Sequence, residues 1–265
     1  MGIKRHLVLG GSGTIGKPFC DYLQSCGEEV INIDLKEGFD LRVQSLEPYK
    51  NVDLVWFLAW DVGGSKYLND EHRKRDIIKN NSQISCSVFN FLETTGLPFV
   101  FASSQLAEID NTYGITKILG EEWTRLLGGK TVKFWNVFGW EEPGQRSHVI
   151  PDLIVNALKN NEIQLMTNGE EKRQFIYVED CVRNLVQVSN MPLQEYHLTN
   201  GKWTSILEIA QIIGKQLDVS VRVGPIEGYH NPVNTNDSYK EFEFRFSLKE
   251  GIQKVIQKAT NAIAQ

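Results

Sequence analysis

Short apolar runs alternate with longer segments of helical periodicity in the first half of the chain. The runs are four to eight residues long, rich in Val, Ile, Leu and Phe, and typical of strands buried on both faces. Between them, apolar residues recur every three to four positions, which predicts helices. The expected strands are residues 6–11, 29–34, 52–59, 98–103 and 131–139, and the expected helices are 14–26, a long one ending near 93, and 112–127.

This alternation predicts an α/β fold built on a doubly wound parallel sheet. Ligands of such sheets lie beyond the carboxyl ends of the strands, so functional residues are expected just after each strand. After residue 139 the pattern is less regular: a loop at 140–147, then further helices and short strands. We predict a first domain over residues 1–140 and a smaller C-terminal substrate-binding lobe over 141–265, interleaved with the sheet.

The composition points to a small-molecule ligand. The 265 residues carry a net charge of −5 and no long Lys/Arg block, which removes the usual electrostatic basis for binding nucleic acid or an anionic membrane. The chain contains neither a signal-peptide core nor a long apolar span, so a cytoplasmic location is expected. The four cysteines form no CxxC pair and are expected to be buried free thiols, with no metal site.

A glycine-rich turn, GGSGTIG, follows the first expected strand and opens the first helix. Gly10 permits a tight turn, Gly13 lets the backbone approach a pyrophosphate, and Gly16 allows close packing of helix on strand. Thr14 and Ile15 lie in the same turn, at a helix N-terminus whose free N–H groups suit phosphates. The first domain is therefore predicted to be a Rossmann domain that binds a dinucleotide.

The expected cofactor is NAD. Asp34 ends the second strand, where a carboxylate can accept hydrogen bonds from both ribose hydroxyls and would repel a 2′-phosphate. The neighbouring Lys36 weakens that preference. Asp40 and Leu41 are candidates for the adenine edge of the site, with a solvated loop carboxylate as the alternative for Asp40.

Ser104, Tyr113 and Lys117 form a candidate catalytic set. Ser104 follows an expected strand, and YGITK places Tyr113 and Lys117 one helical turn apart on the same face. Hydride transfer at a carbinol carbon needs a group that takes the hydroxyl proton. An unperturbed tyrosine is too weak a base for this, and a neighbouring ammonium would lower its pKa. Ser104 would hold the substrate oxygen, and Lys117 could also bond the nicotinamide ribose.

The order of these motifs resembles that of the extended short-chain dehydrogenases/reductases, the family of NAD-dependent nucleotide-sugar epimerases and dehydratases. The matching segments are GGSGTIG, Asp34, FDLR, FLAW, Asn81, ASSQ, YGITK, KFWNVFG, HVIP and RQFIYVED. Within the family, AWDVGG, NVFG, SHVIP and RQFIYVED are most similar to GDP-fucose synthase and GDP-mannose 3,5-epimerase.

The resemblance implies a nucleotide-diphosphate sugar as substrate and a homodimer formed through two helices. It also implies further site residues. Those of the cofactor groove are Leu58, Ala59 and Asn81, and those near the substrate are Gln105, Asn136, His148 and Arg173. Arg173 is the strongest candidate for the diphosphate, because a guanidinium suits bidentate phosphate contacts. His148 and Asn136 are equally compatible with structural roles.

Departures from the family narrow the expected reaction. Relatives that epimerise at two carbons carry a Cys and a His where this chain has Leu106 and Glu141, and 4,6-dehydratases carry Asp-Glu where it has Gln105 and Leu106. The remaining set suffices for oxidation and reduction at one carbon. We therefore expect a C4 epimerase that keeps its NAD bound. The alternatives are a 4-ketoreductase or dehydrogenase using free NAD(P)H, and a non-catalytic NAD-binding regulatory protein.

Two loops also depart from the family. The connection between Ser104 and Tyr113 is much shorter than usual, which suggests a more open pocket for a bulkier sugar. Residues 228–237 stand where relatives often carry an Arg for the diphosphate.

Overall fold

The central sheet has six parallel strands. The computed structural model describes residues 2–108, 111–228 and 236–263. The strand order is β2-β1-β3-β4-β5-β9, and every neighbouring pair is parallel. The bounds are β1 Arg5–Leu9, β2 Glu29–Ile33, β3 Leu54–Phe57, β4 Phe99–Ser104, β5 Lys130–Phe134 and β9 Glu195–Leu198. The predicted doubly wound parallel sheet is confirmed.

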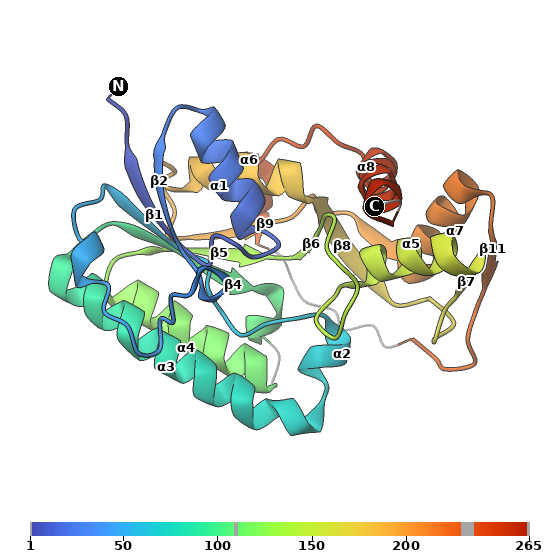
Figure 1. Cartoon of the computed structure of the whole chain (residues 1–265), viewed down its shortest axis with the longest axis horizontal. Helices are drawn as coiled ribbons and strands as arrows, with labels where there is room; N and C mark the ends of the chain where they lie inside the picture. The colour runs from blue at the N-terminus through green and yellow to red at the C-terminus, as the bar shows by residue number, and fades with distance from the viewer. Residues whose placement is uncertain (1, 109–110, 229–235, 264–265) are drawn as a thin grey trace.

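Helices cover both faces of this sheet. Helices α1 (Gly16–Ser25) and α6 (Val178–Val188) lie against one face, and α3 (Glu71–Thr95) and α4 (Thr112–Leu126) against the other (Figure 1). Alternation along β3 explains the two layers, because successive side chains of a strand point to opposite faces. Trp56 packs edge-on against Phe19 of α1, whereas Phe57 packs against Phe89 of α3.

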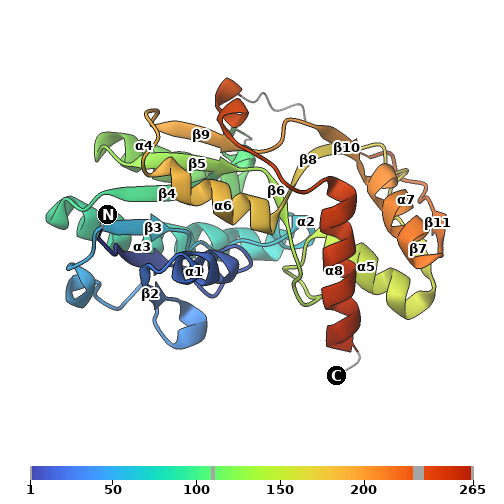
Figure 2. The ribbon, with the colours of Figure 1, turned by 90° about the horizontal axis from the view of Figure 1, so that it is seen from above.

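The second half of the chain builds a smaller group of elements beside the carboxyl ends of the strands (Figure 2). It contains two short sheets, in the orders β10-β8-β6 and β11-β7, and the mutually packed helices α5, α7 and α8. The bounds are β6 Asn136–Phe138, β7 Glu162–Gln164, β8 Lys172–Tyr177, β10 Trp203–Ser205, β11 Ser220–Arg222, α5 Val149–Asn160, α7 Ile206–Leu217 and α8 Leu248–Ile263. In the first half, the short helix α2 (Ser65–Leu68) precedes α3.

The single strand expected over residues 131–139 is two strands. β5 continues the main sheet, while β6 pairs with β8 in the small sheet, and the chain changes sheet at Trp135. An unbroken run of buried apolar residues looks the same in sequence whichever sheet buries it. From the C-terminal half, β9 pairs with β5.

The four cysteines are all free, but only two of them are buried. Cys20 and Cys181 lie in the core, whereas Cys26 and Cys86 are exposed, so the expectation of burial is wrong for that second pair. Cys26 caps the end of α1, and Cys86 lies on the solvent side of α3. Within the described ranges, no helix is both long and apolar enough to cross a membrane.

Candidate active site

The glycine turn is closed by contacts that admit no side chain. Gly10 has φ +89°, and a Cβ there would lie 2.6 Å from the main-chain nitrogen of Ala59. A Cβ on Gly16 would lie 2.0 Å from the Gly10 carbonyl oxygen. Gly13 differs, because its Cβ position meets only that same oxygen, at 3.3 Å. Gly10 and Gly16 thus shape the turn, and Gly13 leaves an open surface above it.

Asp34 lies against this turn. Its carboxylate accepts hydrogen bonds from the main-chain nitrogen of Ser12, at 3.0 Å, and from that of Lys36, at 2.8 Å. Helix α1 starts with no side-chain cap, but its first turn already uses its N–H groups in part, since Lys17 and Phe19 donate to the carbonyls of Gly13 and Ile15 and Pro18 has no N–H. An open glycine surface, an uncapped helix start and a carboxylate at the end of β2 fit the pyrophosphate and adenosine ribose of NAD.

Asp40 is held by a partner that the sequence did not single out. Arg42 donates to its carboxylate through Nε, at 2.9 Å, and through a terminal nitrogen, at 2.7 Å. Arg42 also donates to Asn80. The hydrogen bonds from Arg42 to Asp40 hold the pKa of that carboxyl below its usual value. Leu41, between them, is buried. The Asp40–Arg42 pair is thus a rigidly held ion pair near the predicted adenine site.

Ser104 and Tyr113 meet at the carboxyl end of β4. Tyr113 lies in the first turn of α4, whose N-cap Asn111 accepts a hydrogen bond from Gly114 N at 2.8 Å. Burial raises the pKa of Tyr113, and a hydrogen bond with Ser104 lowers it only partly. Ser104 Oγ also accepts a hydrogen bond from Leu106 N at 3.1 Å, which fixes its position.

Lys117 is buried beneath this pair. Its Nζ donates a hydrogen bond to the main-chain oxygen of Ala102 at 2.5 Å and lies 5.8 Å from the centroid of the Tyr113 ring. Burial lowers the pKa of Lys117 well below its ordinary value. The expected lowering of the Tyr113 pKa by Lys117 is not found in this state: burial raises that pKa, and the influence that lowers it is the hydrogen bond with Ser104.

The other predicted cofactor residues line the ends of β1 and β3. Leu58 donates its main-chain N–H to the Leu9 carbonyl, and the Ala59 backbone lies against Gly10. Asn81 on α3 is fully buried, and its amide oxygen accepts a hydrogen bond from Asp61 N at 2.7 Å. Asn81 therefore fixes the chain that follows β3.

Glu141 joins the glycine turn to the smaller lobe. One carboxylate oxygen accepts a hydrogen bond from Thr14 Oγ1 at 3.2 Å, and the other lies 2.8 Å from His148 Nδ1. It also accepts from the main-chain nitrogen of His148, the N-cap residue of α5. The structure thus brings Thr14 and His148 to opposite sides of one carboxylate.

A second clamp holds the loop before α5. Asp61 is buried after β3 and accepts hydrogen bonds from Tyr67, at 2.8 Å, and Asn80, at 2.8 Å. Arg146 lies 2.9 Å from the same carboxylate, and its guanidinium stacks 4.2 Å from the centroid of the Tyr67 ring. The Gly64 N–H also bonds to the Arg146 carbonyl. The loop is therefore tied to the first half of the chain.

The remaining predicted substrate residues lie in three places. Gln105 is buried directly after Ser104. Asn136 joins two strands, donating to the Gln174 carbonyl at 3.2 Å. Arg173 lies on β8, where burial lowers its pKa. Residues 109–110 of the short Ser104–Tyr113 connection and 229–235 of the expected departure from the family lie outside the described residues.

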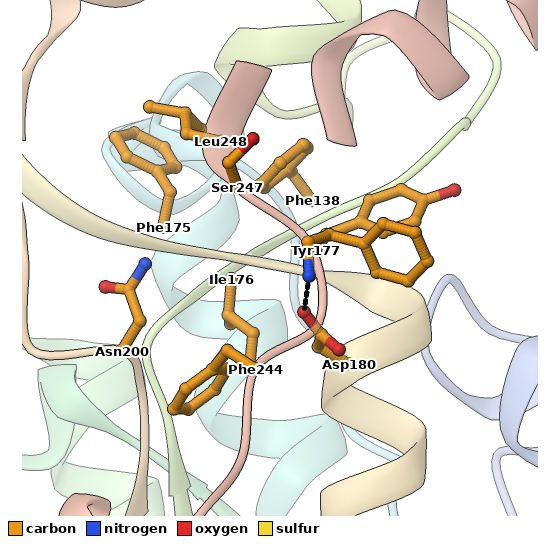
Figure 3. A pocket seen from close by; sticks show the side chains of 10 residues that line it. Phe138, Phe175, Ile176, Tyr177, Asp180, Asn200, Phe244, Ser247 and Leu248 are labelled. Atoms are coloured by element: carbon orange, nitrogen blue, oxygen red, sulfur yellow. Dashed lines mark hydrogen bonds between the residues drawn. The ribbon is translucent and has the colours of Figure 1, made fainter. Parts of the chain in front are cut away.

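A small pocket between β6, β8 and the segment before α8 has a structural role (Figure 3). Its cavity volume is about 10 Å³, room for about one water molecule. Asp180 at its edge accepts hydrogen bonds from the main-chain nitrogens of Arg245 and Phe246, both at 3.0 Å, which clasps this segment onto α6. The lining residues are Phe138, Phe175, Ile176, Tyr177, Asp180, Asn200, Phe244, Phe246, Ser247 and Leu248.

Trp60 and Glu121 were missed by the sequence reasoning. Trp60 lies 4.1 Å from Lys117 Nζ, measured to the ring centroid, and Glu121 is the acidic neighbour that raises the pKa of Lys117. Each had a local signal. Trp60 stands immediately after an expected strand, and Glu121 follows Lys117 by one helical turn on the same face.

Comparison with known proteins agrees with this geometry. A family model described as the NAD dependent epimerase/dehydratase family matches residues 6–200. The chain is 28% identical over 193 residues to a UDP-2-acetamido-2,6-beta-L-arabino-hexul-4-ose reductase of Pseudomonas aeruginosa, covering 69% of this chain and 48% of that protein, about half its length. It is 24% identical to a putative UDP-glucose 4-epimerase of Methanocaldococcus jannaschii, covering 94% of this chain and 96% of that protein.

A solved structure shows the same fold over nearly the whole chain. The NAD-dependent NDP-hexosamine 5,6-dehydratase TunA aligns with a TM-score of 0.83 at 20% identity, covering 97% of this chain and 98% of that one. Identity at this level establishes the fold.

Proposed function

Because the chain belongs to the NAD dependent epimerase/dehydratase family, we propose that it is a nucleotide-sugar epimerase that oxidises and re-reduces the sugar C4 with its own bound NAD. The observation that carries this proposal is the meeting of Ser104 and Tyr113 at the carboxyl end of β4, above the buried Lys117. A 4-epimerisation needs one acid/base group at one carbon, and Tyr113 supplies it.

In this proposal each side chain acts on the C4 oxygen or on its neighbour. Tyr113 acts after ionisation to the phenolate, which the Lys117 ammonium stabilises. Ser104 holds the sugar hydroxyl, and the Tyr113 phenolate takes the hydroxyl proton as the C4–H bond breaks. When bound, NAD would supply the hydride acceptor and then the hydride donor. The 4-keto sugar then rotates in the pocket so that its other face meets the cofactor. Tyr113 returns its proton to the C4 oxygen, which restores the starting state of the protein. Atoms and electrons balance without an external reductant.

The remaining predicted site residues enter as parts of the same proposal. Gly10, Gly13, Thr14, Ile15 and Gly16 would surround the pyrophosphate. The adenosine side would be bounded by Asp34, Asp40 and Leu41, the nicotinamide side by Leu58, Ala59 and Asn81, and the nucleotide sugar by Gln105, Asn136, His148 and Arg173. Support comes from the glycine cradle and from the contact of Thr14 and His148 with one carboxylate.

Release of bound cofactor tests the proposal. Purified protein is denatured, and NAD in the supernatant is quantified by mass spectrometry and absorbance. Close to one NAD per chain, with interconversion of UDP-glucose and UDP-galactose in the absence of added cofactor, is the expected result. No retained NAD together with turnover only when NAD(P)H is added would overturn it.

A 4-ketoreductase is the second candidate. The similarity to the hexul-4-ose reductase favours it, since that match has the higher identity of the two relatives, although it covers less of the chain. The same catalytic set would serve, with Tyr113 donating its proton to a 4-keto oxygen. A reductase exchanges its cofactor in every cycle, so cofactor retention separates the two candidates. The Asp34 carboxylate, which disfavours a 2′-phosphate, supports the epimerase.

We further propose a cytoplasmic homodimer that pairs through α3 and α4. Five large apolar side chains are exposed on these helices, between 43% and 62%: Ile78, Ile115, Ile118, Leu119 and Leu126. Large exposed apolar surfaces are typical of protein interfaces. Light scattering on a sizing column tests the assembly. A dimer that becomes monomeric on Ile118→Lys supports the proposal, and a monomeric wild type contradicts it.

A further inference from the structure

Lys117 is surrounded by aromatic rings. Its Nζ lies 4.1 Å from the centroid of the Trp60 ring, 4.8 Å from that of Phe101 and 5.8 Å from that of Tyr113. Burial has removed water from the ammonium, and its hydrogen bond to the Ala102 carbonyl is the contact that fixes it to β4. The faces of aromatic rings attract such a desolvated cation.

Trp60 is itself held in place. Its Nε1 donates a hydrogen bond to Thr116 Oγ1 at 3.1 Å, which ties the ring to the helix that carries Lys117. The indole also packs against Phe57 and Phe101, with centroids 5.6 and 5.3 Å away. The ring therefore cannot turn away from the ammonium without breaking a buried hydrogen bond.

We propose that Trp60 is a positioning residue that seats the Lys117 ammonium for catalysis by Tyr113. This inference rests on the proposed function, because it assigns Trp60 to the machinery of the Tyr113 acid/base. Trp60 would not touch the reacting sugar carbon. It would keep Lys117 charged and at a fixed place beneath the phenol.

Few charged groups compete for this role. Burial lowers the pKa of Lys117, and Glu121, on its own helix, raises it. Glu121 is shared with other partners, since Ser103 on β4 donates to it and Lys133 on β5 lies 3.4 Å from it. Tyr113, from the start of α4, faces the ammonium as a neutral phenol at ordinary pH.

From the strand end that carries Trp60, the nearest carboxylate in sequence is that of Asp61. Tyr67, Asn80 and Arg146 already hold that carboxylate. Ser104, at the end of β4, carries no charge. The π face of Trp60 and the Glu121 carboxylate are thus main influences that oppose the lowering of the Lys117 pKa by burial.

Three variants distinguish an effect of the Trp60 π face on Lys117 from a general effect on the stability of the fold. Trp60→Leu removes the π face and the hydrogen bond, Trp60→Phe keeps a smaller π face, and Trp56→Leu is the matched control. Trp56 is a fully buried tryptophan on β3 that faces α1, away from Lys117. Each protein is loaded with NAD before measurement.

The direct readout is the titration of Lys117. Lysine labelled with ¹³C at Cε is followed by NMR, and the Lys117 signal is assigned by its absence in Lys117→Met. Trp60→Leu should lower the titration midpoint by about one pH unit and Trp60→Phe by less than half of that, because a desolvated cation–π contact is worth roughly that much. Trp56→Leu should leave it unchanged. A midpoint unaltered in Trp60→Leu, or lowered equally in Trp56→Leu, overturns the inference.

The kinetic readout is the pH profile of kcat/KM. With less charge on Lys117, formation of the Tyr113 phenolate needs a higher pH, so the acidic limb of Trp60→Leu should move upward by about one pH unit. The titration needs no turnover. If no nucleotide sugar reacts with the wild type, the proposed function fails, and the NMR midpoints still decide the position of Trp60.

Discussion

Glu141 holds His148 by both its ring and its main chain: the carboxylate lies 2.8 Å from Nδ1 and accepts a hydrogen bond from the backbone nitrogen. The other carboxylate oxygen accepts from Thr14 in the glycine turn. A single side chain therefore connects the predicted pyrophosphate site to the start of α5. The position of His148 relative to the cofactor depends on this carboxylate.

Glu141→Ala should weaken both the fold and substrate binding. Loss of the carboxylate at the start of α5 should cost about 1 kcal/mol and lower Tm by about 2–4 °C. Release of His148 should raise KM for the nucleotide sugar about fivefold with less change in kcat. Calorimetry and steady-state kinetics check this. The control is Glu142→Ala, at the exposed neighbouring position, and an equal effect in both variants would contradict the role of Glu141.

Gly13→Ala should retain the fold and lose the cofactor. The added methyl group meets only the Gly10 carbonyl oxygen, at 3.3 Å, so Tm should change by less than about 2 °C. The same methyl would occupy the approach of a pyrophosphate, and NAD retained per chain should fall at least about tenfold. Gly144→Ala, where a Cβ meets nothing within 4 Å, is the control. Full NAD content in Gly13→Ala would show that the pyrophosphate lies elsewhere.

Tyr113→Phe should remove catalysis and keep NAD. Loss of a positioned acid/base group lowers kcat by about 10²- to 10⁴-fold. The ring itself remains, so Tm and bound NAD should be close to wild type. Tyr22→Phe, on α1 at the other face of the sheet, is the control and should be fully active. If Tyr113→Phe kept the biological activity of the protein intact, the non-catalytic regulatory alternative would be favoured instead.

Lys117 gives the protein a specific dependence of stability on pH. Burial lowers its folded pKa below the unfolded value, so between the two the unfolded chain binds more protons and stability rises with pH. The rise ends near pH 10.4, the ordinary lysine value. Lys117→Met should lack it, so the difference in unfolding free energy between wild type and variant should change through this window.

Urea unfolding between pH 6 and pH 10.5 measures that difference. The exposed Lys79→Met serves as the control and should follow the wild-type curve. A Lys117→Met curve parallel to that of the wild type across the whole range would show that the ammonium carries no desolvation penalty.

Local signals in the sequence were sufficient to predict the sheet and to place the candidate catalytic residues Tyr113 and Lys117 on one helix face. The GGSGTIG turn could be predicted because positions 10 and 16 have no room for a Cβ, and the presence of glycine at both positions is visible in the sequence. The proximity of Tyr113 and Lys117 could be predicted because a spacing of four residues places both on one face of a helix. The position of helix α8 had no such signal in the sequence. It depends on the hydrogen bonds that Asp180 accepts from the preceding segment and on packing against α5.

Side-chain partners were the part that the sequence could not supply. Burial, which depends on the three-dimensional structure, raises the pKa of Tyr113. The expectation that Lys117 lowers this pKa was therefore wrong for this state. Trp60 reaches Lys117 from 57 positions earlier in the chain. The change of sheet at Trp135 likewise depends on β8, far along the chain, which offers β6 a partner.

The most direct test of the central claim is the fate of hydrogen at the sugar C4. UDP-glucose carrying deuterium at C4 is incubated with the purified protein and no added cofactor, and the product is examined by NMR and mass spectrometry. Bound NAD that takes hydride and returns it to the other face predicts UDP-galactose with the deuterium still at C4. If deuterium is lost from C4, or if turnover needs added NAD(P)H, the protein is not a self-contained 4-epimerase.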